Sequence, residues 1–477
     1  MYENFDRFKT IDTSSIKAIH QYTVEILSQR GIWVESERAR DIYKVHGCQI
    51  DGKMVKINEK LLDQAIESLP ESFDITPIDP QFKQTFGGDN ASFGFQGGAT
   101  YIAEPDGSRR VSTLNDTHDF FKLAQCFDVI TVNNKIAWPL DVPTEHQHLM
   151  LTYSQIINND KIWNPTMFTI DLVCMALGIT PEKIKSDAER GLHHFYCGVN
   201  PVSPLEHTTL QTDYTIFYAE YGIPSIVSAM PIGGISAPAS VEAVILQNNI
   251  EVLSSMVLSY LVNPKAPVIY GAIGTVGNMK TGGAPVAPPE SKIIEAASIA
   301  LARYYKLPSR ANMGYNDAYT CDFECGAESA LQAYNVIRSG ANMITGIGDV
   351  SSIACSSKEK VILDVELIGY INRIMKPLNF SREKAAVSLI ADTSPQDTYL
   401  TNQHTIKNFR KEFYQPLIFQ NNSYDKWLDG GKQDVAERAS KKVDTLLAQF
   451  KAPDRDPAIL KDLKKYVEKA LGNTLDH

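Results

Sequence analysis

Carboxylates and aromatic side chains are concentrated in one segment of the chain, YNDAYTCDFECGAES, at residues 315–329. Its aromatic and acidic members include Tyr315, Tyr319, Phe323, Asp317 and Glu324. Aromatic faces attract a permanently charged ammonium, and each desolvated cation–π contact contributes up to about 2 kcal/mol. The segment therefore favours a quaternary ammonium site. The same residues are also typical of a filled barrel end followed by a helix whose first turn is acidic.

Histidines provide a second candidate chemistry. His146, His148, His193 and Asp317 would be the metal ligands of a metal-dependent barrel hydrolase. No HExxH motif and no Cys-x₂-Cys pair accompanies them, so a solvated or core role is favoured. No G-x-S-x-G nucleophile elbow occurs, and GAIGTVG at residues 271–277 is not a GxGxxG dinucleotide fingerprint.

Short apolar runs that alternate with helical stretches must position these groups. The expected strands are 128–132, 163–168, 193–199, 225–230, 267–273, 309–315 and 342–348. The expected helices between and after the last four are 241–262, 289–305, 324–340 and 358–375. Such alternation indicates parallel strands joined by right-handed crossovers. With an eighth strand near 99–103, the pattern predicts an α/β fold, a TIM (β/α)₈ barrel with additional N- and C-terminal helices.

Three parts of the chain follow from this pattern. We expect an N-terminal helical extension over residues 1–90, the barrel catalytic domain over 91–380 and a C-terminal helical extension over 381–477. Reactive groups of a barrel lie on the loops after the strands. The loops at 230–240, 271–285, 315–329 and 346–352 contain a single basic residue, Lys280, which argues against a phosphate substrate.

Composition and net charge argue against some classes of binding partner. The net charge is −10 over 477 residues, so nucleic acid and anionic membranes are poor partners. No run of about 18 apolar residues and no apolar signal core occurs. The seven cysteines are scattered, which without a secretion signal indicates reduced thiols in a cytoplasmic protein.

Several long blocks, in order, resemble the trimethylamine methyltransferase superfamily, specifically its members without pyrrolysine. The matching blocks are 47–57, 107–128, 230–258, 277–308, 315–332, 340–350 and 404–431. The resemblance implies a TIM barrel and methyl transfer from a methylated amine to the cobalt of a separate corrinoid protein. Archaeal trimethylamine members carry a pyrrolysine, expected here around 316–326, where every residue is a standard amino acid. That difference points away from trimethylamine.

A quaternary amine fits the residues better than trimethylamine does. A quaternary ammonium releases a neutral amine and needs no proton, whereas a tertiary amine must first be activated, and the sequence offers no evident acid/base pair. We therefore expect a quaternary amine:corrinoid methyltransferase, with glycine betaine as the first substrate and proline betaine, carnitine and γ-butyrobetaine as alternatives. The enzyme would act mainly by orienting the methyl group, while the nucleophilic cobalt of the corrinoid would perform the methyl transfer itself.

Candidate residues follow from this reading. The aromatic ones for the ammonium are Phe95, Tyr101, Trp163, Phe168, Tyr315 and Phe323. Those that offset its charge are Asp317, Glu324 and Asp349, which we treat as the catalytic candidates. All four betaines carry a carboxylate, for which His404 or Asn316 is the expected donor.

Partners and cofactors complete the expectations. The chain has no DxHxxG cobalamin motif, so the corrinoid belongs to a partner protein and no bound metal is expected in this chain. Self-association is expected for an enzyme of this size. A non-catalytic betaine-binding protein and the metal-dependent hydrolase remain the alternatives.

Overall fold

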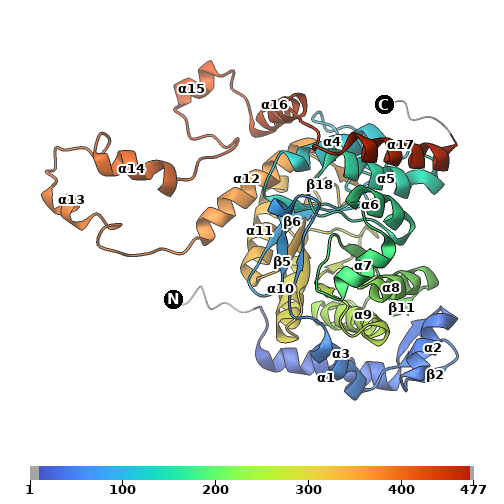
Figure 1. Ribbon diagram of the computed structural model, residues 1–477. Coiled ribbons are helices and arrows are strands. Elements are labelled where there is room, and N and C mark those ends of the chain that lie inside the picture. The colour runs from blue at the N-terminus through green and yellow to red at the C-terminus, as the bar shows by residue number, and fades with distance from the viewer. Residues whose placement is uncertain (1–9, 473–477) are drawn as a thin grey trace.

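The centre of the protein is a seven-stranded parallel sheet in the computed structural model, which describes residues 10–472. Its strands, in spatial order, are β10 (Cys197–Val199), β12 (Ser225–Val227), β14 (Val268–Gly271), β16 (Ser309–Asn312), β17 (Met343–Ile347), β6 (Ser92–Phe95) and β9 (Ile130–Val132). Every neighbouring pair is parallel. The sheet is curled and barrel-like, and helices surround it (Figure 1). The protein is thus an α/β protein, as the alternating pattern predicted.

A short segment lies between the two edge strands of this sheet. Ile162 pairs in parallel with Val132 of β9, where its amide N–H donates to the carbonyl of Thr131 over 3.1 Å. On the other side, the amide of Tyr196 donates to the carbonyl of Trp163 over 3.2 Å, next to β10. Residues 162–163 therefore connect β9 to β10 by backbone hydrogen bonds.

Two strand predictions were wrong. The eighth strand expected near 99–103 is β7 (Tyr101–Ala103), which pairs with β8 (Arg109–Val111) as a hairpin in a separate four-stranded sheet with β18 (Asp349–Val350) and β19 (Cys355–Ser356). The turn at Gly107, with φ of 84°, makes the hairpin possible because glycine adopts this conformation without strain. Most of 163–168 is irregular and leads into a 3₁₀ turn, η3 (Met167–Thr169), since Pro165 has no N–H to donate to a ladder.

Helices on the outside of the sheet follow the predicted alternation. They are α4 (Leu114–Gln125), α5 (Thr144–Asn158), α6 (Ile170–Leu177), α7 (Pro181–Ala188), α8 (Thr209–Tyr221), α9 (Val241–Val262), α10 (Pro289–Tyr304), α11 (Phe323–Ser339) and α12 (Lys358–Met375). The side chain of Ser240 accepts the amide of Ala243 and starts α9, and Gly340, with φ of 81°, ends α11. α9 has the length and apolar composition of a membrane span, but 78% of that window is buried inside the fold, which is typical of a core helix.

The N-terminal helices lie against one side of the body (Figure 1). They are α1 (Thr13–Gln29), α2 (Glu37–Val45) and α3 (Glu59–Ser68), and a small sheet of β1 (Ile32–Val34), β2 (Gln49–Asp51), β3 (Met54–Lys56) and β11 (Glu206–His207) accompanies them. A separate hairpin pairs β4 (Phe73–Ile75) with β5 (Gln84–Phe86). Tyr43 of α2 donates to the carbonyl of Ser254 over 2.9 Å, which anchors this part on α9.

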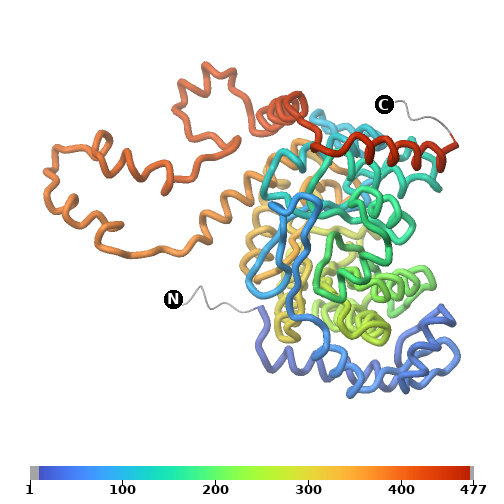
Figure 2. The backbone as a smooth tube through the Cα atoms, viewed as in Figure 1, coloured from blue at the N-terminus to red at the C-terminus, as the bar shows by residue number. Residues whose placement is uncertain are grey.

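The C-terminal helices divide into an arm and a return to the body. Residues 377–433, with α13 (Val387–Asp392), α14 (Gln403–Glu412) and α15 (Tyr424–Asp429), extend away from the barrel as an arm (Figures 1 and 2). None of these three helices, all described in full, contains a buried residue. α16 (Val435–Ala448) then packs on α12, and α17 (Pro457–Leu471) packs on α5 and α6.

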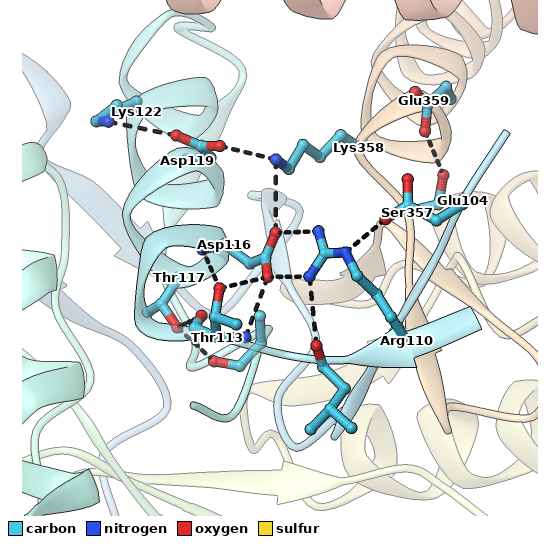
Figure 3. Close-up of polar contacts among 12 residues, drawn as sticks. Glu104, Arg110, Thr113, Asp116, Thr117, Asp119, Lys122, Ser357, Lys358 and Glu359 are labelled. Atoms are coloured by element: carbon cyan, nitrogen blue, oxygen red, sulfur yellow. Dashed lines mark hydrogen bonds and ion pairs between the residues drawn. The ribbon is translucent and has the colours of Figure 1, made fainter. Parts of the chain in front are cut away.

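A charged cluster holds α4, α12 and the β7–β8 hairpin together (Figure 3). Arg110 donates to both carboxylate oxygens of Asp116, over 2.6 and 2.7 Å, and the backbone amide and hydroxyl of Thr113 donate to the same carboxylate. Lys358 of α12 reaches Asp119 at 2.7 Å and Asp116 at 3.6 Å. Burial alone would raise the pKa of Asp116, but the hydrogen bonds from Arg110 and Thr113 outweigh it and lower the pKa to about 2.

Candidate functional site

A cavity of about 310 Å³ lies at the carboxyl ends of the early strands of the barrel. Residues that directly follow β6, β9, residues 162–163, β10 and β12 contribute to it. Its lining residues include Gln96, Asn134, Lys135, Trp138, His148, Asn164, Thr166, Tyr196, Asn200, Tyr214, Tyr218, Ser228 and Arg310. This is the position at which α/β barrels place their active sites, and the volume suits a small organic molecule.

Aromatic rings form one wall of the cavity. Trp138 and His148 meet edge to face with ring centroids 5.2 Å apart, and Tyr214 stacks on Tyr218 at 5.7 Å. Trp138 is fixed by its indole N–H, which donates to Gln147 over 2.6 Å. Burial and the charge of Lys135 lower the pKa of His148 to about 4, so its ring is neutral at pH 7. The wall therefore presents neutral aromatic faces, as a cation-binding surface requires.

Two buried cations line the same cavity. Lys135 is 5% exposed, and its Nζ makes neither a hydrogen bond nor an ion pair with any residue described. Burial lowers its pKa to about 8, which still leaves most of the amine charged at pH 7. Arg310 is also 5% exposed and donates to neutral acceptors, namely Thr345 Oγ1 at 3.0 Å, Asn312 Oδ1 at 2.8 Å and the amide oxygen of Gln96.

No carboxylate lines the cavity among residues 10–472. Glu295 of α10 interacts electrostatically with Arg310, and it accepts from the amide of Asn312 at 3.4 Å and from Gln332 at 2.5 Å. Burial raises the pKa of Glu295 to about 8, so this acid is mostly protonated at pH 7 and does not neutralise the arginine. The site thus carries net positive charge beside an aromatic wall.

Unpaired polar atoms and open space mark the same cavity. The buried Oγ1 of Thr166, Nδ1 of His148 and Oγ of Ser228 have no hydrogen-bond partner in the described structure. Buried polar atoms in proteins are nearly always paired, so we treat these three as candidate partners of a bound molecule. A Cβ placed on Gly198 of β10 meets no atom within 4 Å. The glycine therefore keeps the cavity open.

None of the predicted site residues is among the residues that line this cavity. Phe168 comes nearest, because its ring lies 6.4 Å from His148 and 6.0 Å from Tyr214. Tyr315 is buried with Ile273 and Val286, and the charge of Arg310 acts on its hydroxyl. These two stay candidates for the edge of the site.

The other predicted aromatic residues occupy the outer core or the surface. Phe95 packs edge to face on Phe120 of α4 at 6.1 Å. Tyr101 lies under Arg109 at 4.6 Å. Trp163 lies beneath Arg455 at 5.3 Å, and its indole donates to the carbonyl of Asn159 over 3.0 Å. Phe323, the first residue of α11, is 89% exposed. Phe95 is the one of these four in a strand of the central sheet, and because side chains alternate between the two faces of a strand, it points outward while the next residue, Gln96, lines the cavity.

The predicted polar residues hold loops or lie elsewhere. Asp317 accepts the amides of Val286 and Ala287 over 2.8 and 2.9 Å, and Asn316 donates to the carbonyl of Cys325 over 2.9 Å. Glu324 is exposed in the first turn of α11. His404 is on α14 in the arm, where it lines a different hollow.

Asp349 is the one predicted acid that is buried without full pairing. Its Oδ2 has no hydrogen-bond partner among the residues described, and burial raises its pKa well above the usual range. It lies near the buried ion pair of Lys360 and Asp364, whose atoms are 2.5 Å apart, rather than at the cavity. Asp349 does not line the cavity, so it is not placed to offset the charge of a ligand bound there.

The geometry does not support the metal-dependent hydrolase. No group of three or more His, Cys, Asp or Glu side chains within residues 10–472 is arranged to hold a metal ion. His148 lies in the cavity, but His193 packs edge to face on Phe73 at 5.9 Å and Asp317 is engaged by backbone amides. His148, His193 and Asp317 therefore lie in three different environments, and His146 is near the start of α5.

Lys135, Trp138 and Arg310 were missed by the sequence reasoning. It considered the loops after the later strands, whereas the cavity is lined mainly from the earlier ones. One signal was present: Lys135 and Asn200 follow the predicted strands 128–132 and 193–199 by one to three residues, which is the position that barrel enzymes use. Gln96 and Ser228 follow β6 and β12 in the same way, but only the observed strand ends show it.

Together, the curled parallel sheet and the small-molecule cavity at its strand ends define an α/β protein with a barrel-like architecture. The chain belongs to the trimethylamine methyltransferase (MTTB) family, whose model matches residues 1–472. The resemblance seen in the sequence blocks is thereby confirmed. All residues at 316–326 are standard amino acids, so the chain is a member without pyrrolysine.

Relatives in this family match along almost the whole chain. A glycine betaine methyltransferase of Desulfitobacterium hafniense is 29% identical over 97% of both chains. A proline betaine:corrinoid methyltransferase of Eubacterium limosum is 28% identical over 95% of this chain and 96% of its own. The trimethylamine methyltransferase MttB of Methanosarcina barkeri is 30% identical, covering 96% and 94%.

The fold has a solved counterpart. The crystal structure of the monomethylamine methyltransferase MtmB of Methanosarcina barkeri superposes with a TM-score of 0.50 at 14% identity, over 92% of this chain and 89% of that one. At this identity the likeness concerns the architecture alone. It agrees with an α/β, barrel-like fold.

Proposed function

We propose that this protein transfers a methyl group from a quaternary amine to the Co(I) of a corrinoid carried by a separate protein. Glycine betaine is our first substrate, and proline betaine, carnitine and γ-butyrobetaine form the same substrate class. Relatives named for glycine betaine, proline betaine and L-carnitine support this class.

The observation that carries the proposal is the aromatic cavity at the strand ends. A trimethylammonium group fits against the rings of Trp138, Tyr214 and Tyr218, where cation–π attraction replaces hydration. Its volume of about 310 Å³ admits a betaine but not a corrin ring, so the acceptor must approach from outside. We therefore propose that the partner's corrinoid faces the mouth of this cavity.

The proposed methyl transfer needs no general acid or base. The C–N bond breaks with its electron pair left on nitrogen, which departs as a neutral amine, and an electron pair of Co(I) forms the new bond to carbon. No proton is transferred, which agrees with a cavity that no carboxylate lines. The protein would contribute orientation of the methyl group and exclusion of water.

Further features follow as proposals. Residues 162–163 would serve as the eighth strand that closes the barrel, supported by their backbone hydrogen bonds to both edge strands. Self-association is supported by exposed apolar side chains along the arm, such as Phe380, Leu400 and Phe413. A cytoplasmic location is supported by the seven unpaired thiols, and we expect no metal bound by this chain itself.

The test is a methyl-transfer assay. Purified protein is mixed with Co(I) cobalamin and, separately, each betaine, choline and trimethylamine, and the methyl-Co(III) spectrum is recorded. We expect methylation with at least one betaine and none with trimethylamine. Methylation with trimethylamine alone, or with no quaternary amine, would refute the proposal. Calorimetric binding of a betaine without methylation would instead favour the non-catalytic betaine-binding protein.

A matched variant links the activity to this cavity. Gly198→Val fills open space and needs no positive φ, so the backbone tolerates it. We expect normal thermal unfolding and loss of betaine binding. Gly326→Ala on α11, which also meets no atom within 4 Å, is the control that should leave binding unchanged.

A further inference from the structure

The cavity contains positive charge that the fold itself does not balance. Lys135 Nζ has no partner among the residues described, and Arg310 is held by three neutral side chains. A buried charge without an opposite charge in contact is unfavourable, so a fold that keeps two such cations at one cavity favours an anionic ligand there. The protein as a whole has a net charge of −10, so this positive site is a local feature.

A simple cation does not match such a site. Trimethylammonium or tetramethylammonium would be attracted by the aromatic wall but repelled by Lys135 and Arg310, since no carboxylate lines the cavity. A zwitterion is complementary to both the aromatic rings and the two cations. Its ammonium end meets the rings of Trp138, Tyr214 and Tyr218, and its anionic end meets the two cations.

We propose that Lys135 and Arg310 form the carboxylate-binding site of the substrate cavity and thereby select betaines over quaternary amines without a carboxylate. This assignment rests on the proposed function and deepens it. The donors expected from the sequence, His404 and Asn316, are respectively in the arm and bonded to Cys325 and Ser329.

Lys135 and Arg310 differ in how firmly their side chains are held. Arg310 is oriented by Thr345, Asn312 and Gln96, so its guanidinium is fixed before a ligand arrives. Lys135 follows β9 by three residues and has no such restraint, so it can adjust to carboxylates at different distances from the ammonium. We infer that Arg310 sets the position of the carboxylate and that Lys135 provides most of the charge dependence.

The test compares ligands that differ in the carboxylate. Glycine betaine, choline and acetate are titrated calorimetrically into the full-length protein and into Lys135→Met. For glycine betaine we expect a Kd raised about 10- to 100-fold in the variant, the range of one charged hydrogen bond. The Kd for choline should not rise and should fall by up to about threefold, because the variant removes a cation that repels the ammonium. Lys135→Arg should restore most of the glycine betaine affinity.

Controls separate a binding role from a structural one. Lys280→Met removes an exposed lysine from a strand-end loop outside the cavity and should leave every Kd unchanged. Thermal unfolding of Lys135→Met should show no loss of stability, because the substitution removes a buried charge that no residue compensates. Normal unfolding together with weakened glycine betaine binding supports the proposal.

Each other outcome has a defined meaning. Equal weakening of glycine betaine and choline by Lys135→Met would overturn the carboxylate assignment and leave the methyltransferase proposal standing. Acetate binding as tightly as glycine betaine would also overturn it, in favour of a general anion site. If no betaine binds to the unsubstituted protein, the proposed function fails, and the carboxylate site fails with it.

Discussion

The hydroxyl of Ser352 donates to Oδ1 of Asp317 over 2.6 Å, which ties the turn after β17–β18 to the loop after β16. Residues 351–353 all have positive φ, between 53° and 63°, and include the β-branched Ile353. Such a backbone is strained and persists only where its surroundings hold it. Asp317 provides part of that hold, so its carboxylate stabilises the strand-end loops rather than a ligand.

We predict that Asp317→Asn destabilises the protein by about 1–3 kcal/mol, because one charged acceptor of backbone amides becomes a neutral one. Urea unfolding measures this change. The Kd for glycine betaine should stay within about threefold at low temperature, where the protein remains folded. An unchanged stability with lost turnover would instead give Asp317 the catalytic role expected from the sequence.

Trp138→Leu should weaken binding of any quaternary ammonium, with or without a carboxylate. Removing one desolvated aromatic face is expected to raise the Kd about 5- to 30-fold. Trp427, in the arm and outside the cavity, gives the matched control Trp427→Leu. Calorimetry with choline and glycine betaine checks both variants, and equal affinities of Trp138→Leu and the unsubstituted protein would exclude Trp138 from the site.

Binding of glycine betaine should depend on pH through Lys135. The surrounding groups are Arg310, His148, Cys197, Tyr196, Tyr214 and Tyr218. Burial lowers the pKa of His148 to about 4 and raises those of Cys197 and the three tyrosines above their ordinary values. Guanidinium groups stay protonated throughout, and Lys135 titrates near its pKa of about 8. Glu295, which interacts with Arg310, also has a pKa of about 8, so Lys135→Met is needed to separate the titration of Lys135 from that of Glu295.

The sign follows from the lowered pKa. Lys135 is charged below about pH 8 in the free protein and becomes neutral as the pH rises through that value. Affinity for glycine betaine should therefore fall above about pH 8, by up to about tenfold per pH unit. Choline should show no such fall, and Lys135→Met should remove it. A flat affinity for glycine betaine from pH 6 to 9.5 would contradict a charged lysine at the carboxylate.

Asp116→Asn tests the cluster that joins α4, α12 and the β7–β8 hairpin. The pKa of about 2, lowered by Arg110 and Thr113, corresponds to roughly 2 kcal/mol of stability at pH 7. Because the folded pKa lies below the unfolded value, this stability is present above about pH 4 and is lost as the pH falls toward 2. Urea unfolding at pH 7 should show the loss in the variant, and a stability equal to that of the unsubstituted protein would mean that the cluster contributes nothing.

Local signals in the sequence predicted the four helices α9 to α12 and most strands of the central sheet. α9 and α12 begin and end where the pattern predicted, because a serine cap precedes each and apolar spacing continues to the end. The parallel direction of the strands was predicted from the alternation of strands and helices alone, because a helix that connects two parallel strands forms a right-handed crossover. The family assignment likewise needed only the order of the sequence blocks.

The position of the site was decided by the tertiary structure. Phe323 and Tyr315 are eight residues apart, yet one is 89% exposed and the other is buried, because the start of α11 turns Phe323 outward. Composition marked the acidic, aromatic loop at 315–329, but its carboxylates bond to backbone amides that only folding brings near. The type of a residue shows which interactions its side chain can make. Which of these interactions form within the protein is decided by the segments that fold around it.

Lys135 is the clearest example of a site residue that could not be predicted from the sequence. Its sequence, Asn133-Asn134-Lys135, is that of an ordinary polar loop, and an exposed lysine would be the usual outcome. Only the folded sheet around it buries the amine, leaves it without a carboxylate in the cavity lining and places Trp138 and Arg310 at the same cavity. The sequence determines the chemistry of each side chain, whereas its burial and its lack of a partner arise from segments that are far apart in the chain.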